Sequence, residues 1–183
     1  AMMLVNKYLK VVPVTIHIPI KDITKYLNTE LIEKTIKTTH QELNSRFSIS
    51  NPNIWISGLN PHAGENGTIG NEEQKFIIPI IKKLQSEGYN LLGPLSADTM
   101  FYEKKRPRFD AAICMYHDQA LIPIKTLDFH SSVNLTIGLS FIRTSPDHGT
   151  AFDIAGKNLA NPTSTIEAIK LAWNMAKKEQ KDR

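Results

Sequence analysis

Residues 54–70, IWISGLNPHAGENGTIG, join a short apolar run to a glycine-rich loop, and this stretch decides the fold class. The apolar run at 54–59 predicts a buried strand. Residues 71–87, whose first turn is acidic, predict a helix that ends at Gly88. Pro79 lies inside this helix, so we expect a kink there. A strand, a loop and a helix in this order are typical of an α/β fold.

The rest of the chain repeats this alternation of strands and helices. Short runs rich in β-branched residues predict strands, and segments with apolar residues three and four positions apart predict helices. The strands are expected at 9–16, 110–115, 133–137 and 141–143, and the helices at 29–43 and 163–178. We therefore predict a largely parallel sheet flanked by helices, with functional residues in the loops at the carboxyl ends of the strands.

Composition limits the class of protein. The chain has 183 residues, 41% of them apolar, which is enough for a core and excludes a disordered chain. No apolar run is long enough for a membrane span, and the start lacks the pattern of a signal peptide. The single cysteine, Cys114, is expected to be a small buried side chain in a protein of the reducing cytoplasm.

The charge balance argues against a nucleic-acid partner. The formal net charge is +4, and the basic clusters at 104–106 and 177–183 contain no interleaved aromatic residues. Solvated surfaces explain both clusters better than a nucleic-acid interface does. A small anionic substrate also suits this sign of charge.

Three histidines directly follow predicted strands. His17, His62 and His117 are expected at strand ends, where three neutral imidazoles can hold a divalent metal and leave a position open for a substrate oxygen. Taken singly, each histidine is more often a capping or core residue than a metal ligand. Their shared placement at strand ends makes a metal site as good an interpretation as three structural residues. Asp118 and Glu65 could orient the rings.

Two further groups of residues suggest an anion-binding site. The loop at 58–70 offers backbone donors and a helix N-terminus, which can bind an anion. A tight connection without a binding role would have the same sequence features. Lys125, Asn134 and Arg143 provide two cations and an amide, the groups that a phosphate or carboxylate pocket requires. Each of the three alone is more often a surface residue.

The segment at 147–162, DHGTAFDIAGKNLANP, resembles the dinucleotide-binding loop of the isocitrate and isopropylmalate dehydrogenase-like superfamily, which binds NAD(P) without a Gly-x-Gly-x-x-Gly fingerprint. Together with four more motifs, the segment resembles the 4-hydroxythreonine-4-phosphate dehydrogenase family of vitamin B6 biosynthesis. These motifs are GLNPHAGE at 58–65, GPLSADT at 93–99, MYHDQ at 115–119 and IRTSPDHGTA at 142–151. The resemblance runs from Met2 to about Met175. Where the family commonly has Gly, this chain has Ala120.

The resemblance implies roles for residues at the matching positions. It implies an isocitrate/isopropylmalate dehydrogenase-like fold, a homodimer whose active site lies at the subunit interface, and a divalent metal such as zinc, magnesium or cobalt. The metal ligands would be His17, His62 and His117. The substrate would contact Lys125, Asn134 and Arg143, and Lys125 and Asp98 would have catalytic or supporting roles. The residues that would contact NAD or NADP are His148, Gly149, Thr150, Ala151, Asp153 and Asn161.

The family also has an N-terminal portion that is not in this sequence. We therefore expect a C-terminal fragment, inactive alone, with a partial metal- and substrate-binding and dimerisation domain at 1–140 and a partial return to the nucleotide-binding domain at 141–183. In such a fragment the apolar side chains Ile166, Ile169 and Trp173 of the last helix would be exposed or covered by another copy.

The reaction that the resemblance implies is oxidation of the C3 hydroxyl of 4-phosphooxy-L-threonine, a small phosphorylated substrate, with decarboxylation to 3-amino-2-oxopropyl phosphate. A metal would stabilise the developing alkoxide. Related enzymes that act on other phosphorylated hydroxy acids or on aromatic dihydrodiols share most of these motifs. A three-histidine zinc hydrolase and an inactive interaction module are the alternatives from other classes.

Overall fold

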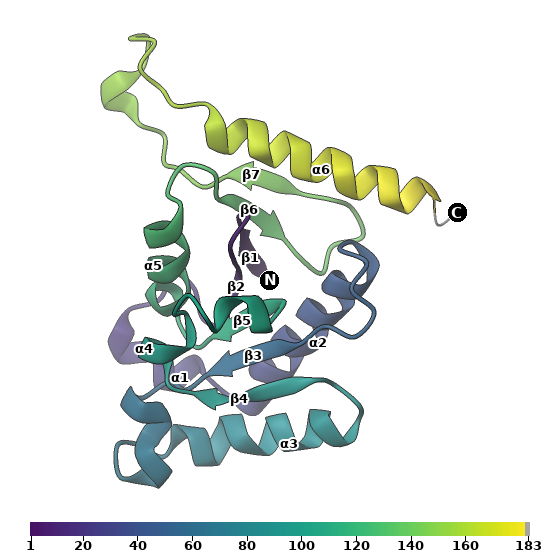
Figure 1. Cartoon of the computed structure of the whole chain (residues 1–183). Coiled ribbons are helices and arrows are strands. Elements are labelled where there is room, and N and C mark those ends of the chain that lie inside the picture. Colours follow the sequence, from purple (N-terminus) through teal and green to yellow (C-terminus); the bar gives the residue numbers. More distant parts are fainter. Residues whose placement is uncertain (182–183) are drawn as a thin grey trace.

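The chain forms one sheet with helices on both faces in a computed structural model that describes residues 1–181 (Figure 1). The strands are β1 (Met2–Val5), β2 (Lys10–Pro13), β3 (Ile54–Ser57), β4 (Leu91–Leu95), β5 (Ala111–Cys114), β6 (Val133–Thr136) and β7 (Thr144–Pro146). The helices are α1 (Ile23–Tyr26), α2 (Thr29–Ser45), α3 (Ile78–Ser86), α4 (Ala97–Met100), α5 (His117–Leu127) and α6 (Thr163–Lys181). The predicted α/β class is therefore confirmed.

The seven strands are arranged in the order β4-β3-β5-β2-β1-β6-β7. The four strands from β4 to β2 pair in parallel, as expected from the alternation of strands and helices. The pairings of β1 with β2, β1 with β6 and β6 with β7 are antiparallel. The sheet is mixed, with one parallel half and one antiparallel half.

The antiparallel half begins with a hairpin of β1 and β2, of which the sequence predicted only the second strand, at 9–16. The Asn6 side chain accepts hydrogen bonds from the backbone N–H groups of Tyr8 and Leu9, both at 2.9 Å, and this turn reverses the chain. The predicted strand was thus too long, because β2 ends at Pro13, and β1 was missed. The chain beyond β2 still follows β5, since the Val14 N–H donates to the Cys114 carbonyl at 2.8 Å.

Two apolar clusters lie on opposite faces of the sheet. On one face, Ile32 and Ile36 of α2, Leu84 of α3 and Met175 of α6 pack against the strands. On the other face, α5 packs with Leu4, Val11, Trp55 and the buried thiol Cys114, as the composition predicted for that cysteine. Burial of these side chains drives formation of the layered fold.

The predicted helices are present with small changes. The Asn28 side chain caps α2 by accepting from the Leu31 N–H at 2.8 Å. Ahead of α3, residues Glu73–Ile77 form a π-helical turn, which accommodates Pro79 near the start of the α-helix. Gly88 ends the helix with a φ of +93°.

The last part of the chain packs against the same sheet. The strand predicted at 141–143 lies three residues later, at Thr144–Pro146, because residues after Gly138 (φ +79°) form the connection from β6. In α6 the side chains of Ala168 and Met175 are buried, whereas Ile166, Ile169 and Trp173 are exposed. The structure describes no helix, in residues 1–181, that is long and apolar enough to cross a bilayer.

Candidate active site at the carboxyl ends of the parallel strands

The three predicted metal ligands lie beyond the same edge of the sheet. His17 follows β2, His62 follows β3 and His117 follows β5. These strands are neighbours and run in parallel, so their carboxyl ends meet at one edge. The sequence pattern therefore placed three histidines in one region of the fold.

Two of these imidazoles are close neighbours. The ring centroids of His17 and His117 lie 5.5 Å apart. Two imidazoles bound to one tetrahedral ion, with metal–nitrogen distances of about 2.1 Å, hold their centroids roughly 5 Å apart, so the pair fits a shared cation. The Nδ1 atom of His117 lies 2.7 Å from an oxygen of Asp118, an arrangement that leaves Nε2 free to bind a metal.

The third imidazole does not complete this pair within the chain. Among residues 1–181, no three His, Cys, Asp or Glu side chains lie together as a metal-binding group. His62 lies near Asp98, which accepts a hydrogen bond from the Ser96 hydroxyl at 2.6 Å. That bond lowers the pKa of Asp98, and a protonated His62 lowers it further. Asp98 thus stays ionised beside the histidine edge.

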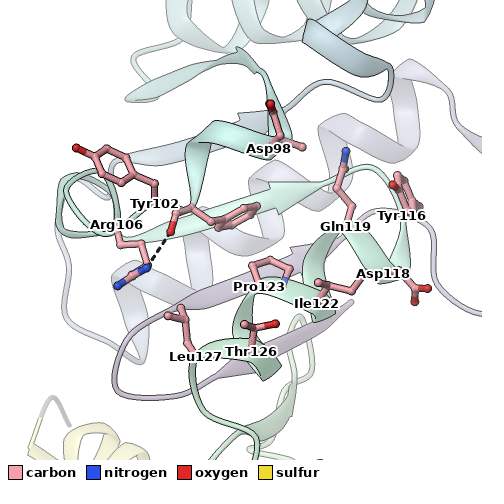
Figure 2. Close-up of a pocket in the computed structure, with 12 residues that line it drawn as sticks. Asp98, Tyr102, Arg106, Tyr116, Asp118, Gln119, Ile122, Pro123, Thr126 and Leu127 are labelled. Carbon is pink, nitrogen blue, oxygen red and sulfur yellow. Dashed lines mark hydrogen bonds between the residues drawn. The ribbon is translucent and has the colours of Figure 1, made fainter.

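A pocket of about 500 Å³ opens next to the histidine edge (Figure 2). Asp98, Tyr116 and Asp118 contribute polar groups at one end, and Ile122 and Leu127 of α5 contribute an apolar wall. The volume lies within the range of small-molecule sites. The pocket therefore combines carboxylates and an apolar surface beside His117.

Lys125 is paired with Asp147, a residue that had no predicted role. Its ammonium group lies 3.2 Å from Oδ2 of Asp147, an ion pair without hydrogen-bond alignment, so this buried oxygen has no donor among residues 1–181. Burial raises the pKa of Asp147, and the charges of Lys125, His117 and His148 oppose that rise. Asp147 therefore lies among the predicted metal, substrate and cofactor residues.

Asn134 faces the same side of the sheet as Lys125. It pairs with Leu4 of β1 and Ser145 of β7, and paired residues point to one face. Leu4 packs against Ile124 of α5, next to Lys125. The buried Oδ1 of Asn134 accepts no hydrogen bond within the described chain, so it is available to a ligand.

Arg143 lies directly before β7 and has an exposed side chain. It donates a hydrogen bond to the Thr136 hydroxyl at 2.7 Å. Thr136 lies two residues after Asn134 on β6 and so points to the same face. The three predicted substrate residues, Lys125, Asn134 and Arg143, thus come from one side of the antiparallel half.

The predicted cofactor loop forms a pocket of about 440 Å³. Five of the six predicted residues line it, together with Asp147 and Ser164; the five are His148, Gly149, Thr150, Ala151 and Asn161. The sixth, Asp153, lies exposed on the short 3-10 turn at Phe152–Ile154. Since Gly149 has open space around its Cα, a ligand can approach the backbone there.

Two residues that support the site, Gln119 and Glu73, had no predicted role in it. The Gln119 side chain accepts from the Ser57 hydroxyl and the Met115 N–H, both at 2.7 Å, and donates to the Gly58 carbonyl at 2.8 Å. It thereby links the ends of β3 and β5. The second is Glu73, which the sequence assigned only to a helix N-terminus. Nothing but its place in the motif at 115–119 could have indicated Gln119.

Comparison with known proteins decides the family. The family described as "Pyridoxal phosphate biosynthetic protein PdxA" matches residues 1–172. The chain belongs to this PdxA family. A curated PdxA relative, 4-hydroxythreonine-4-phosphate dehydrogenase of Roseobacter denitrificans, is 61% identical over 175 residues, which are 96% of this chain and 54% of the relative.

Solved structures of the PdxA type share the fold. The crystal structure of 4-hydroxythreonine-4-phosphate dehydrogenase from Klebsiella pneumoniae is 41% identical and superposes with a TM-score of 0.87, covering 96% of this chain and 53% of that one. A terephthalate 1,2-cis-dihydrodiol dehydrogenase from Burkholderia xenovorans is 33% identical with a TM-score of 0.77, covering 94% and 55%. The chain spans about half the length of the curated relatives that it matches.

Proposed function

We propose that this chain forms the metal- and substrate-binding part of a cytoplasmic, NAD- or NADP-dependent dehydrogenase. Its reaction would be oxidation of 4-phosphooxy-L-threonine at the C3 hydroxyl, with decarboxylation to 3-amino-2-oxopropyl phosphate. The observation that carries this proposal is the placement of His17, His62 and His117 at the ends of three adjacent parallel strands. The names of the relatives support the same reaction.

His17 and His117 would hold a divalent cation such as zinc, magnesium or cobalt, and His62 would be the third ligand. A cation at this position supplies a fixed positive charge that stabilises negative charge on an alcohol oxygen. Asp118 fixes the orientation of the His117 ring through its contact at 2.7 Å. Because these groups are held by the sheet, they need little rearrangement when substrate binds.

Lys125, Asn134 and Arg143 would bind the anionic and polar groups of the substrate. The Arg143 guanidinium can pair with a phosphate or carboxylate through two hydrogen bonds, and Asn134 has a free buried oxygen. Asp147 keeps the Lys125 ammonium next to the site through the ion pair at 3.2 Å. Lys125 and Asp98 remain the candidates for moving the hydroxyl proton.

The pocket at 148–161 would receive the dinucleotide, which supplies the two-electron acceptor. Its volume of about 440 Å³ and its open glycine backbone support this assignment. Asp147 borders both this pocket and Lys125, so substrate and cofactor would bind side by side. Such proximity is what transfer between two bound molecules requires.

A homodimer would complete the site. The three histidines are not grouped within residues 1–181 of one chain, and a side chain from a second subunit would supply the missing ligand. The exposed Ile122 and Tyr102 beside the pocket of Figure 2 provide an apolar surface for such a contact.

A second candidate substrate class deserves a direct comparison, because the Burkholderia relative is named for a terephthalate dihydrodiol. A dihydrodiol of terephthalate carries carboxylates, which Arg143 and Lys125 can bind as they bind a phosphate, so the two cations suit both classes. The names of the more similar relatives favour the phosphorylated hydroxy acid. A three-histidine zinc hydrolase would need no dinucleotide pocket.

Turnover by the protein encoded by the complete gene tests the proposal. We expect NADH or NADPH to form with 4-phosphooxy-L-threonine and a divalent metal, and not with an aromatic cis-dihydrodiol. Absorbance at the reduced-nicotinamide band measures this. Phosphoester cleavage without a dinucleotide would instead identify a hydrolase and contradict the proposal.

Arg143→Ala should raise KM for 4-phosphooxy-L-threonine roughly 10- to 150-fold, because loss of a charge-assisted contact costs about 1.5–3 kcal/mol. Steady-state kinetics on the complete protein measures the change. Arg108→Ala, which removes an exposed arginine from the 3-10 turn at Arg106–Arg108, is the matched control and should leave KM unchanged. An unchanged KM in the Arg143 variant would remove this residue from the substrate pocket.

A further inference from the structure

The loop that carries His62 has an unusual backbone. Residues 62–66 all have positive φ, with values of 54°, 53°, 77°, 41° and 59°, so they form a left-handed turn. Only one of the five is a glycine, Gly64. Each non-glycine residue in this conformation costs about 1–2 kcal/mol, and such a turn persists only where its surroundings hold it.

One buried carboxylate binds the backbone directly before this turn. Glu73, which is 2% exposed, accepts hydrogen bonds through Oε1 from the backbone N–H groups of Leu59 at 2.8 Å and Asn60 at 2.7 Å. Its Oε2 accepts from the Asn60 side chain at 2.9 Å. No Lys or Arg pairs with Glu73 within residues 1–181, so these N–H donors compensate its burial.

The glycines of the loop leave room for this carboxylate. A Cβ atom at Gly64 would lie 2.5 Å from Oε2 of Glu73, so this carboxylate excludes a side chain there. A Cβ atom at Gly58 would meet the Cα of Ala63 first, at 2.7 Å, and Oε1 of Glu73 at 3.0 Å, so the loop backbone and the carboxylate together exclude a side chain at that position. The Glu73 carboxylate therefore lies between the loop and the π-helical turn at Glu73–Ile77, and it contacts the loop.

We propose that Glu73 is a positioning residue for His62: its buried carboxylate fixes the left-handed turn and thereby the place of the imidazole at the histidine edge. The part of the inference that concerns metal rests on the proposed function. The part that concerns the position of His62 rests on the contacts of Glu73 alone. Glu73 is a positioning residue and not a catalytic one, because its carboxylate bonds to Leu59 and Asn60 and not to the His62 ring.

Glu73→Gln is the central test, since it replaces Oε2 with an amide nitrogen that faces the Asn60 side-chain donor. Glu72→Gln is the matched control. Glu72 accepts from the side chain of Asn60 at 2.7 Å, and it does not accept from the backbone N–H groups of Leu59 and Asn60 that Glu73 holds. Asn60→Ala is a second variant that weakens the hold on Glu73 without altering the carboxylate.

Three readouts separate positioning from general stability. The NMR signals of the His62 imidazole, identified by their absence in His62→Ala, report the ring position without metal. Cleavage by a Glu-specific protease after Glu65 reports opening of the turn, and the thermal midpoint reports overall stability. We expect Glu73→Gln to shift or broaden the His62 signals and to speed the cleavage at least 10-fold, and Asn60→Ala to do so less, while Glu72→Gln matches the parent protein.

Zinc binding by the complete protein, measured by equilibrium dialysis, adds the functional readout. Residues that orient a metal ligand typically change affinity about 10- to 100-fold, and we expect a loss in that range for Glu73→Gln. Unchanged His62 signals and unchanged cleavage in both Glu73→Gln and Asn60→Ala would overturn the positioning role. Full zinc retention by His62→Ala would instead overturn the proposed metal site, so the two failures are distinguishable.

Discussion

Replacing His117 with alanine is expected to abolish metal retention and turnover in the complete protein. His117 is the imidazole that the structure brings closest to a second ligand, with its ring centroid 5.5 Å from that of His17. It is also the one whose orientation is fixed by a carboxylate, at 2.7 Å from Asp118. Losing one of three ligands should lower the affinity for zinc by roughly 100-fold or more. Metal analysis after dialysis and steady-state kinetics measure the two effects.

The matched control is His40→Ala, which removes a histidine from α2, where the ring packs against Tyr89 with a centroid distance of 4.6 Å. This variant should keep its metal and its kcat. Asp118→Asn should have an intermediate effect of about 10- to 100-fold on metal affinity, because it weakens the orientation of His117 without removing a ligand. A His117 variant with the metal content of the parent would show that the histidine edge is not a metal site.

The position of this site could be predicted because it depends on features that are local in sequence. An apolar run followed by a histidine occurs three times, and parallel strands bring their carboxyl ends together whatever their order in the sheet. The resemblance of the motifs at 58–65 and 115–119 implied that these histidines bind a metal, and that role stays a prediction. The same reasoning predicted α2, β5 and α6 to within a few residues, whereas α3 begins seven residues later than predicted and α5 was not predicted.

The antiparallel half of the sheet could not be predicted in this way. β1 has only four residues, too few to show a periodicity, so the sequence indicated a strand at 9–16 and none before it. The chain reverses because the Asn6 side chain accepts hydrogen bonds from two backbone N–H groups. Such contacts do not appear in the hydrophobic periodicity from which the strands were predicted. β7 was displaced for a similar reason, because a three-residue strand has almost no periodicity.

Asp147 and Glu73 were missed because burial decides their roles. In sequence, Asp147 is one acid in a polar segment; in the fold its side chain is mostly buried, with 12% exposed, beside Lys125. Glu73 follows Glu72, and either one suits the first turn of a helix; the structure buries only Glu73 against the loop. Whether a carboxylate turns inward depends on which donors the fold places around it.

Glu42→Ala is expected to cause the largest loss of stability among the substitutions considered for this chain. Glu42 and Arg46 of α2 form a buried ion pair at 2.7 Å, with side chains only 6% and 7% exposed. Arg46 also donates to the Leu139 carbonyl at 2.9 Å and to Glu179 of α6 at 3.1 Å. The pair therefore joins α2, the connection after β6, and α6.

Removing the carboxylate leaves a buried guanidinium without its main counter-charge, which typically costs about 3–5 kcal/mol. For a chain of this size that corresponds to a fall in Tm of roughly 10 °C. Urea unfolding followed by circular dichroism measures the free energy, and differential scanning calorimetry measures Tm.

Lys83→Ala is the control for the loss of an ion pair as such. Lys83 pairs with Glu33 at 2.8 Å on the surface, where it is 53% exposed, so its loss should cost less than about 1 kcal/mol. Replacing Glu42 and Arg46 together by Leu and Met should recover most of the stability lost in Glu42→Ala, because no unpaired charge then remains in the interior. If Glu42→Ala were no less stable than Lys83→Ala, water would have to reach Arg46 in the native state, and this network would not be what holds α6 against the sheet.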